Sequence, residues 1–437
     1  MNDRADALRR QILELVREYY GIAHAPAPFV PGQSRVPYAG RVFDARELEN
    51  LVESSLEFWL TAGPWGQSFE KEMRKFFGAV DFLLVNSGSS ANLTMVSALS
   101  SSMVDAPLRR GDEVITPAVT FPTTLTPIVQ NGLVPVFVDC EIGTYNADPA
   151  AVEAAIGPRT RALMIPHTLG NPFDLARLAP LAERHGLYLL EDCCDALGSR
   201  FDGRLVGTFG HMASLSFYPA HHMTMGEGGG VVVNRAGLSR AAQSIRDWGR
   251  DCWCPPGQAN TCGKRFEWQL GDLPFGYDHK YIFSNLGYNL KVTDMQAAIG
   301  LAQLEKLPDF CARRRANFRR LYDGATRWAD RLVLPRALPQ ADPAWFGFPV
   351  TVRAGVSRLE LIRFLEARRV ETRLIFCGNV LRQPGFRDIP HRVVGDLRNS
   401  DTVMNDTFFL GVYPGLTSAM LDYVLESLEA FFSRGRS

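Results

Sequence analysis

The stretch "DFLLVNSGSSANLTMVSALS", residues 81–100, contains the strand–turn–helix unit that sets the fold of this chain. Its apolar start predicts a buried strand, "NSGSSAN" (86–92) predicts a tight turn, and the apolar spacing that follows predicts a helix. Small residues in such a turn let backbone N–H groups and hydroxyls reach an anion, and the helix dipole favours its charge. The stretch therefore predicts either an anion cradle or an ordinary strand–helix turn.

Apolar strands alternate with helical patterns along the chain as far as residue 234. Strands are predicted within 112–132, 134–140, 161–167, 187–194, 213–219 and 228–234, with helices between several of them. This alternation predicts an α/β fold with a largely parallel sheet covered on both faces. Ligands bind at the carboxyl ends of such strands. Polar or aromatic residues gather there at Ser87–Ser90, Thr120, Phe121, His167, Asp192, Ser216 and His221.

The length of 437 residues predicts more than one structural unit. Residues 1–43 are expected to form a helix followed by a Pro/Gly-rich connector. Residues 44–290 are expected to form a large domain, including an ordered loop at 250–284 that is rich in Pro, Gly, Cys and aromatic residues. Residues 291–437 are expected to form a bridging helix, kinked or broken near Pro308, and a smaller C-terminal α+β domain.

Composition gives no sign of a nucleic-acid or membrane partner. The formal net charge is zero and 22% of residues are charged. No apolar run approaches the roughly 20 residues of a membrane span, and the charged residues 1–24 predict an amphipathic helix rather than a secretory signal. We therefore expect a cytoplasmic protein, in which the eight cysteines do not form a disulfide framework.

Four of the cysteines are spaced as metal ligands could be. Cys252, Cys254 and Cys262 fall within eleven residues of the 250–284 loop, and Cys194 follows a predicted strand. Strand alternation puts Cys194 on the same side as Asp192 and turns Cys193 away. Four converging thiolates suit zinc or an iron–sulfur cluster, although one residue between two cysteines is shorter than structural zinc sites prefer. Free buried cysteines are the alternative.

Three further motifs carry residues with possible chemistry. "SFYPAHHMTMGEGGG" (216–230) contains His221 and His222, which could be a general base near neutral pH or ordinary turn histidines. Asp192 could hold a pyridine nitrogen protonated or cap a helix. Phe121 could stack on a ring or belong to the core.

Together these motifs resemble the DegT/DnrJ/EryC1/StrS sugar aminotransferase family from about residue 44 to the C-terminus. The matching segments are "SGSSAN", "ITPAVTFPTT", "VFVDCEIGTYNADP", "LLEDCCDALGS", "SFYPAHHMTMGEGG" and "GYNLKVTDMQAAIGLAQLEKL". The resemblance implies the aspartate-aminotransferase fold (fold type I of the pyridoxal-phosphate enzymes) and a homodimer. It implies phosphate contacts from Gly88, Ser89, Ser90 and Ser216, a further phosphate contact from Asn289 of the neighbouring subunit, ring stacking by Phe121, and a pyridine-nitrogen contact from Asp192.

Two departures from the family's usual pattern narrow this resemblance to one group of enzymes within the family. His221 stands where the family has its cofactor-binding lysine, and Cys194, Cys252, Cys254 and Cys262 are separated by 57, one and seven residues, as in the family's iron–sulfur dehydratases. These imply pyridoxamine 5'-phosphate, with His221 as the base, a [2Fe-2S] cluster, and a separate NADH-dependent flavin and iron–sulfur reductase. Asp195, where relatives often have Gln or His, is left without a role.

The implied reaction is loss of the C3 hydroxyl from a nucleotide-linked 4-keto-6-deoxyhexose in dideoxysugar and lipopolysaccharide synthesis. CDP is the implied nucleotide, with a TDP sugar as the alternative. Three other functions remain open: a cluster-free dehydratase recycled by glutamate, a conventional aminotransferase, and a zinc-stabilised binding protein. The nearest downstream lysine, Lys264, lies in the 250–284 loop, which disfavours the aminotransferase.

Overall fold

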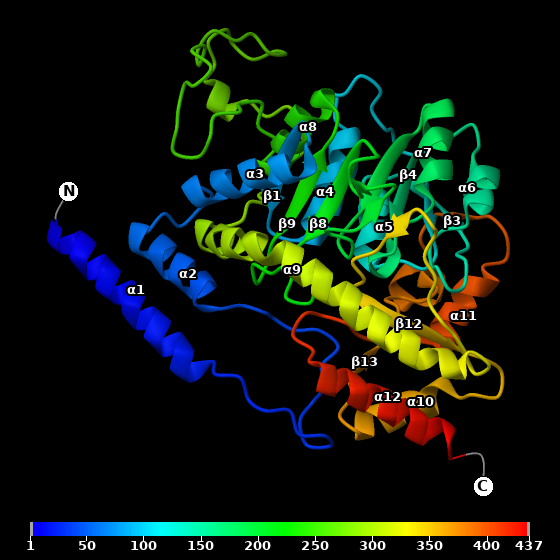
Figure 1. Ribbon diagram of the computed structural model, residues 1–437. Coiled ribbons are helices and arrows are strands. Elements are labelled where there is room, and N and C mark those ends of the chain that lie inside the picture. The colour runs from blue at the N-terminus through cyan, green and yellow to red at the C-terminus, as the bar shows by residue number, and fades with distance from the viewer. Residues whose placement is uncertain (1–2, 435–437) are drawn as a thin grey trace.

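An eight-stranded sheet forms the centre of the computed structural model, which describes residues 3–434 (Figure 1). In spatial order the strands are β1 (Asp81–Val85), β9 (Gly229–Val233), β8 (Met212–Ser216), β5 (Tyr188–Asp192), β4 (Thr160–Pro166), β2 (Glu113–Pro117), β3 (Val134–Val138) and β14 (Arg392–Val393). All neighbouring pairs from β8 to β14 are parallel. Only β9 is antiparallel to its neighbours. The prediction of a mostly parallel sheet is therefore confirmed.

The two faces of this sheet are covered by different helices and hold separate apolar cores. In β1, Phe82 and Leu84 belong to one core, whereas Leu83 and Val85 belong to the other, as expected for a strand buried on both faces. The first face is covered by α3 (Pro64–Phe77), α6 (Pro149–Ala155), α7 (Leu175–Arg184) and α9 (Asp294–Ala325). The second is covered by α4 (Gly88–Leu99), α5 (Pro122–Gln130) and α8 (Ala236–Arg246).

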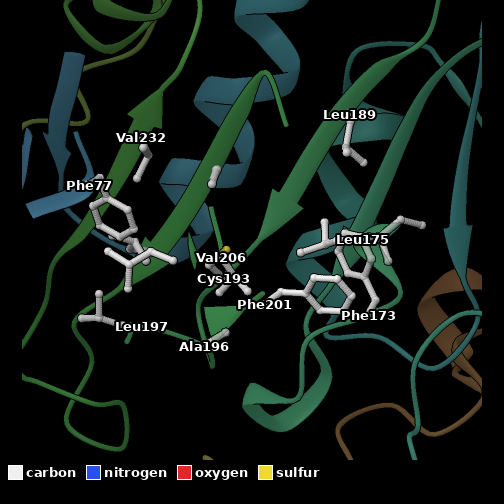
Figure 2. Packing of buried hydrophobic residues seen from close by; sticks show 14 of the residues in the cluster. Phe77, Phe173, Leu175, Leu189, Cys193, Ala196, Leu197, Phe201, Val206 and Val232 are labelled. Atoms are coloured by element: carbon white, nitrogen blue, oxygen red, sulfur yellow. The ribbon is translucent and has the colours of Figure 1, made fainter. Parts of the chain in front are cut away.

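Part of the first core is shown in Figure 2, where Cys193 packs with Phe201, Val206 and Ala196. Cys193 is fully buried there, directly after β5. Its neighbours Asp192 and Cys194 face the opposite way, toward the cleft described below. The alternation along the strand thus separates a core cysteine from a cleft cysteine.

The C-terminal part of the chain forms a second, smaller sheet with its own core. In spatial order its antiparallel strands are β10 (Leu332–Val333), β12 (Gly347–Val352), β15 (Thr407–Gly411) and β13 (Thr372–Arg373). The helices α10 (Arg358–Ala367), α11 (Arg398–Asp406) and α12 (Ser418–Phe432) accompany it. A three-stranded sheet joins β11 (Ala341–Asp342) to β6 (Arg200–Phe201) and β7 (Arg204–Leu205).

The long helix α9 continues through Pro308, so of the predicted kink or break at this residue the break is wrong. Proline removes one backbone hydrogen bond and crowds the preceding turn. Leu307, Phe310 and Cys311 are buried beside it, so tertiary packing on both sides of the proline holds the helix together.

The remaining segments are the two N-terminal helices and the short 3₁₀ helices. α1 (Asp3–Ala23) has no buried residue and lies beside α2 (Ala45–Glu57), to which Arg17 is ion-paired through Glu49 at 2.6 Å. The short 3₁₀ helices are η1 (Thr168–Gly170), η2 (His279–Tyr281), η3 (Thr326–Trp328), η4 (Val380–Arg382) and η5 (Pro384–Phe386). Within residues 3–434, no helix has the length and apolar character needed to cross a bilayer.

Candidate active site

A cleft of about 430 Å³ opens at the carboxyl ends of the parallel strands, between the large sheet and the smaller one. The segments after β1, β2, β4, β5 and β8 supply most of its wall. The smaller sheet contributes Phe346, Arg373 and Phe409, and Tyr38 comes from the connector after α1. The cleft therefore lies where a parallel sheet is expected to bind its ligand.

The first turn of α4 lies in the cleft wall, at the stretch that predicted either an anion cradle or an ordinary strand–helix turn. Ser87 caps this helix by accepting a hydrogen bond from the Ser90 backbone N–H at 3.0 Å. The Ser90 hydroxyl in turn donates to Asn86 Oδ1 at 2.6 Å, so Ser90 stabilises the turn. Gly88 and Ser89 line the cleft with Ser87. Backbone N–H groups at this helix start face a space that suits a phosphate.

We expect Gly88→Ala to weaken binding of a phosphate-bearing cofactor and to destabilise the fold. A Cβ on this residue would lie 2.7 Å from Ser216 Cβ and 2.8 Å from Cys194 Sγ, so the cradle must widen. Overpacking of this kind costs about 1–3 kcal/mol. Thermal unfolding with and without pyridoxal phosphate measures both effects. Gly237→Ala is the matched control, because a Cβ there meets nothing within 4 Å; equal effects of the two substitutions would contradict the steric account.

Asp192, at the end of β5, presents a carboxylate whose position is fixed by four hydrogen bonds. Oδ2 accepts from Asn92 Nδ2 at 2.9 Å and from Thr124 Oγ1 at 2.7 Å. Oδ1 accepts from the Cys194 backbone N–H at 3.1 Å and from Ser214 Oγ at 3.2 Å. A buried carboxylate held in this way can pair with a protonated ring nitrogen.

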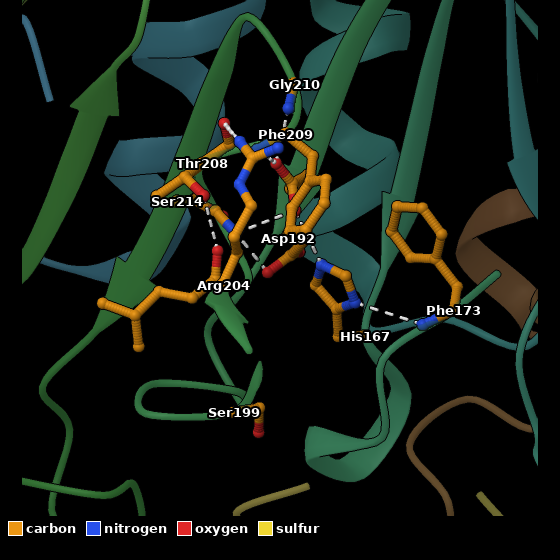
Figure 3. Close-up of polar contacts among 12 residues, drawn as sticks. His167, Phe173, Asp192, Ser199, Arg204, Thr208, Phe209, Gly210 and Ser214 are labelled. Atoms are coloured by element: carbon orange, nitrogen blue, oxygen red, sulfur yellow. Dashed lines mark hydrogen bonds and ion pairs between the residues drawn. The ribbon is translucent and has the colours of Figure 1, made fainter. Parts of the chain in front are cut away.

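A second polar network lies directly behind Asp192, as Figure 3 shows. His167 Nδ1 accepts from the Phe173 backbone N–H at 3.2 Å, and Nε2 lies 3.1 Å from Glu191 Oε2. Glu191 also accepts from three backbone N–H groups, of residues 207, 209 and 210. His167, Glu191 and Cys193 are the only three side chains of metal-ligand type grouped within 4.8 Å in residues 3–434. The histidine and carboxylate are already satisfied by hydrogen bonds, so we assign this group a structural role.

The two adjacent histidines face different environments. His221 lines the cleft, and its Nδ1 lies 3.3 Å from Asp195 Oδ1, within ion-pair distance but without a well-directed hydrogen bond. Burial raises the pKa of Asp195. His222 is buried, donates from Nε2 to the Ala344 carbonyl, and has its pKa lowered well below the usual value by that burial. Of these two histidines, only His221 is therefore placed to move a proton in the cleft.

Arg314, which the sequence analysis did not single out, holds the His221 turn from α9. Its guanidinium donates to the carbonyls of His221 at 2.9 Å and Ala220 at 3.4 Å, and to those of Trp345 and Phe346 at 3.3 and 3.2 Å. It is 1% exposed, and burial lowers its pKa to about 10, which still leaves it charged at neutral pH. In the sequence it is one of three consecutive arginines, 313–315, so no local signal distinguishes it.

We expect Arg314→Met to destabilise the protein markedly. The aliphatic side chain fills part of the space but leaves the four carbonyls without their donor, at about 1–3 kcal/mol for each group that stays unsatisfied. Arg313→Met is the matched control, because Arg313 lies on the surface of the same helix, where it is ion-paired with Asp309 at 2.8 Å. Thermal unfolding of both variants measures the difference, and equal melting temperatures would show that Arg314 does not support this turn.

Phe121 lies on the cleft wall before α5. It is 49% exposed and makes an edge-to-face contact with Phe376, at 5.7 Å between ring centroids. A half-exposed aromatic ring is not a core residue, so the prediction that Phe121 belongs to the core is excluded. The free face of this ring is available for stacking.

The predicted site residues divide into two groups. Those in the cleft wall are Gly88, Ser89, Phe121, Asp192, Cys194, Ser216 and His221. Ser90, in the first turn of α4, does not line the cleft, and neither do Asn289, Cys252, Cys254 and Cys262, which lie on the segment between α8 and α9 of their own chain. Asn289 instead accepts a hydrogen bond from Lys291 Nζ at 2.6 Å.

Within one chain the four cysteine sulfur atoms do not converge on one point. No three of their sulfur atoms lie within 4.8 Å of one another in the part of the chain that the structure describes. Cys194 Sγ has Ser214 Oγ as a neighbour, at 3.8 Å, and adjoins Gly88. Burial opposes ionisation of Cys254, but hydrogen bonds from Thr261, including one from its hydroxyl at 3.1 Å, lower the pKa of this thiol to about 7.

The fold and the cleft place the molecule in fold type I of the pyridoxal-phosphate enzymes. An Escherichia coli GDP-4-keto-6-deoxy-D-mannose-3-dehydratase with bound hydrated PLP superposes with a TM-score of 0.81 at 29% identity, covering 90% of this chain and 99% of that one. A mutant form of GDP-4-keto-6-deoxymannose-3-dehydratase with bound GDP-perosamine also gives a TM-score of 0.81 at 29% identity, covering 90% and 100%.

Sequence comparison identifies the family within this class. The profile of the DegT/DnrJ/EryC1/StrS aminotransferase family matches residues 42–429, and the chain belongs to that family. The lipopolysaccharide biosynthesis protein RfbH of Salmonella typhimurium is 52% identical over 98% of this chain and 99% of its own. The dTDP-4-dehydro-2,6-dideoxy-D-glucose 3-dehydratase of Saccharopolyspora spinosa is 52% identical over 97% of this chain and 92% of its own.

Proposed function

We propose that this protein is a pyridoxamine-phosphate-dependent 3-dehydratase of nucleotide-linked 4-keto-6-deoxyhexoses. One observation carries this proposal: in the cleft of a fold type I enzyme, a histidine stands where a lysine would bind the cofactor covalently. No lysine lines this cleft among residues 3–434. The names of the dTDP-sugar and GDP-sugar relatives support the same reaction class.

The residues present fit the cofactor without a covalent bond to the protein. The start of α4, with Gly88 and Ser89, would hold the phosphate, Asp192 would face the ring nitrogen, and Phe121 would stack on the ring. When bound, pyridoxamine phosphate supplies an amine for the sugar ketone and a ring that accepts electron density.

The side chains then have separate tasks. His221 moves a proton at the cofactor's C4′ carbon, and the fixed negative charge of Asp192 keeps the ring nitrogen protonated. Asp195 places a carboxylate 3.3 Å from His221 Nδ1, and Arg314 fixes the backbone that carries the histidine. The enzyme can therefore transfer a proton without the covalent attachment that favours transamination.

We expect Asp195→Asn to reduce activity modestly, by less than the loss of His221 itself. The amide keeps the shape of the side chain but removes the negative charge that lies 3.3 Å from His221 Nδ1, so a positive charge that forms on the His221 ring during proton transfer is stabilised less. The kcat of dehydration and the melting temperature measure the two possible effects. A lower melting temperature with an unchanged kcat would indicate a purely structural role for Asp195.

Replacement of the C3 hydroxyl by hydrogen is a two-electron reduction, and the side chains of the cleft cannot supply these electrons. We infer that Cys194, Cys252, Cys254 and Cys262 would hold a [2Fe-2S] cluster, which would supply one-electron transfer from an NADH-dependent flavin and iron–sulfur reductase. The spacing of the cysteines supports this inference. In the same way we infer a homodimer, from the resemblance that implies a phosphate contact by Asn289 of the neighbouring subunit.

The nucleotide that carries the sugar could be CDP or dTDP. The cysteine spacing resembles that of CDP-6-deoxy-L-threo-D-glycero-4-hexulose-3-dehydrase, so we propose CDP-4-keto-6-deoxyglucose as the substrate. The name of the Salmonella relative supports a role in lipopolysaccharide synthesis, whereas that of the Saccharopolyspora relative favours a dTDP sugar. Parallel assays with CDP- and dTDP-linked substrates distinguish them.

The separation of the cysteines within one chain favours a second candidate, a cluster-free dehydratase that glutamate recycles. The deciding experiment is the iron and acid-labile sulfide content of anaerobically purified protein. About two of each per chain, with visible charge-transfer bands, supports the cluster. Their absence after anaerobic reconstitution favours the glutamate-recycled enzyme.

A further inference from the structure

The loop at residues 250–284 projects from its own chain as an ordered unit. Figure 1 shows the segment between α8 and α9 leaving the body of the molecule at the top of the view. Arg265 pairs with Asp278 at 2.9 Å, and His279 Nε2 lies 2.7 Å from Asp251 Oδ1. Trp268 stacks on His279, with ring centroids 4.7 Å apart. These contacts within the loop give it a defined shape, and Arg240 of α8 supports it by lying over the Trp253 ring, 4.1 Å from its centroid.

The ends of the loop are locked together at its base. The Trp248 N–H donates to the Tyr288 carbonyl at 2.7 Å, and the Ser284 N–H donates to the Gly249 carbonyl at 2.9 Å. Gly249 has a φ of +81°, and a Cβ there would collide with the carbonyl oxygen of Asn285. A swing of the loop into its own cleft would have to open this crossing, so the loop cysteines are held away from Cys194 of the same chain.

The loop also exposes an unusually apolar surface. Phe266, Phe275, Tyr281 and Phe283 are each more than half exposed, and Leu286, just beyond the loop, is 96% exposed. Exposed apolar groups gathered on one ordered segment indicate a protein contact. The three loop cysteines and the predicted cofactor ligand Asn289 lie on this segment, and all four are missing from the cleft of their own chain.

We propose that this loop docks on a second copy of the chain and that each cluster site is shared between subunits. Cys252, Cys254 and Cys262 would come from one chain and the fourth sulfur from Cys194 of the partner subunit. The occupant is a second copy because Cys194 of an identical chain supplies the ligand that the loop lacks. A two-fold symmetric exchange of loops completes both sites and covers the exposed aromatic residues. The inference rests on the proposed cluster.

Mixed dimers test where the fourth ligand comes from. Cys194→Ala and Cys252→Ala chains carrying different tags are co-expressed, and the mixed dimer is isolated through both tags. A shared site predicts that each variant alone lacks iron, whereas the mixed dimer regains about half of the wild-type iron and sulfide, because one of its two sites has four intact ligands. An iron-free mixed dimer would place all four ligands in one chain and overturn the proposal.

Two measurements keep this test separate from the proposed function. A wild-type protein without iron would count against the cluster alone, so the docking is also tested on metal-free protein with a short bis-maleimide. We expect a covalent dimer that forms with wild-type protein and is lost both in Cys194→Ala and in the triple Cys252→Ala, Cys254→Ala, Cys262→Ala variant. A monomer in sedimentation, or cross-linking only within chains, would overturn the loop exchange. A doubly tagged dimer of Cys194→Ala chains controls for subunit mixing and should contain no iron.

Discussion

His221→Asn is expected to abolish C3 dehydration while leaving the cofactor bound. Asparagine is polar and smaller than histidine, so it fits the turn between β8 and β9, but its amide cannot accept a proton near neutral pH. The cradle at α4, Asp192 and Phe121 do not depend on the His221 side chain. Loss of a general base lowers turnover by about 10²–10⁴-fold.

Two readouts are needed because cofactor binding and chemistry should separate. Absorbance of the bound cofactor after gel filtration reports binding, and a single-turnover assay of sugar dehydration reports chemistry. His222→Asn is the neighbouring control: His222 is buried away from the cleft and donates to Ala344, so this change should lower the melting temperature but not the turnover of the folded enzyme. Near-normal turnover of His221→Asn would remove His221 as the base.

The fold could be predicted from sequence because its signals are local. The buried strands read as short apolar runs, and the Gly/Ser turn at 86–92 leads directly into α4, where Ser87 caps the helix. Residues at the ends of neighbouring parallel strands must meet at one edge of the sheet. That rule alone brings Gly88, Phe121, Asp192 and His221 into one cleft.

The supporting residues could not be predicted because they act over long sequence separations. Asn92 reaches Asp192 across 100 positions and Thr124 across 68, while Arg314 reaches His221 across 93. An amide or hydroxyl on a helix carries no local mark of such a partner. Pro308 is the opposite case. Proline locally predicts a break in the helix, but packing around α9 keeps the helix continuous.

The position of the 250–284 loop could not be predicted from the sequence for a different reason. Its cysteines could be grouped by spacing, but spacing does not state whether they converge within one chain or between two. Ligands that lie far apart in sequence can be joined by folding or by symmetry with equal ease. The locked base of the loop, which depends on the crossing at Gly249, is a feature of three-dimensional structure alone.

Asp192→Asn is expected to leave the protein folded and to lower dehydration by about 10²–10³-fold, the usual cost of removing one fixed electrostatic partner from an active site. The new amide would meet donors on both sides, yet the site can adapt. Asn92 Oδ1 is buried without a hydrogen-bond partner, so a flip of the Asn92 amide lets it accept from the new N–H group. The hydroxyl of Thr124 can rotate to accept as well.

The loss should therefore come from charge rather than from shape. A neutral amide cannot keep the ring nitrogen protonated, so electron density is no longer drawn away from the carbon at which His221 acts. Thr124→Val is the matched control, since it removes one of the four hydrogen bonds but keeps the carboxylate, and its activity should fall far less. The melting temperature of each variant and the cofactor's absorption spectrum across pH separate the two causes. If Thr124→Val and Asp192→Asn lost activity equally, the position of the carboxylate would matter rather than its charge, and the proposed partner of the ring nitrogen would have to be another group.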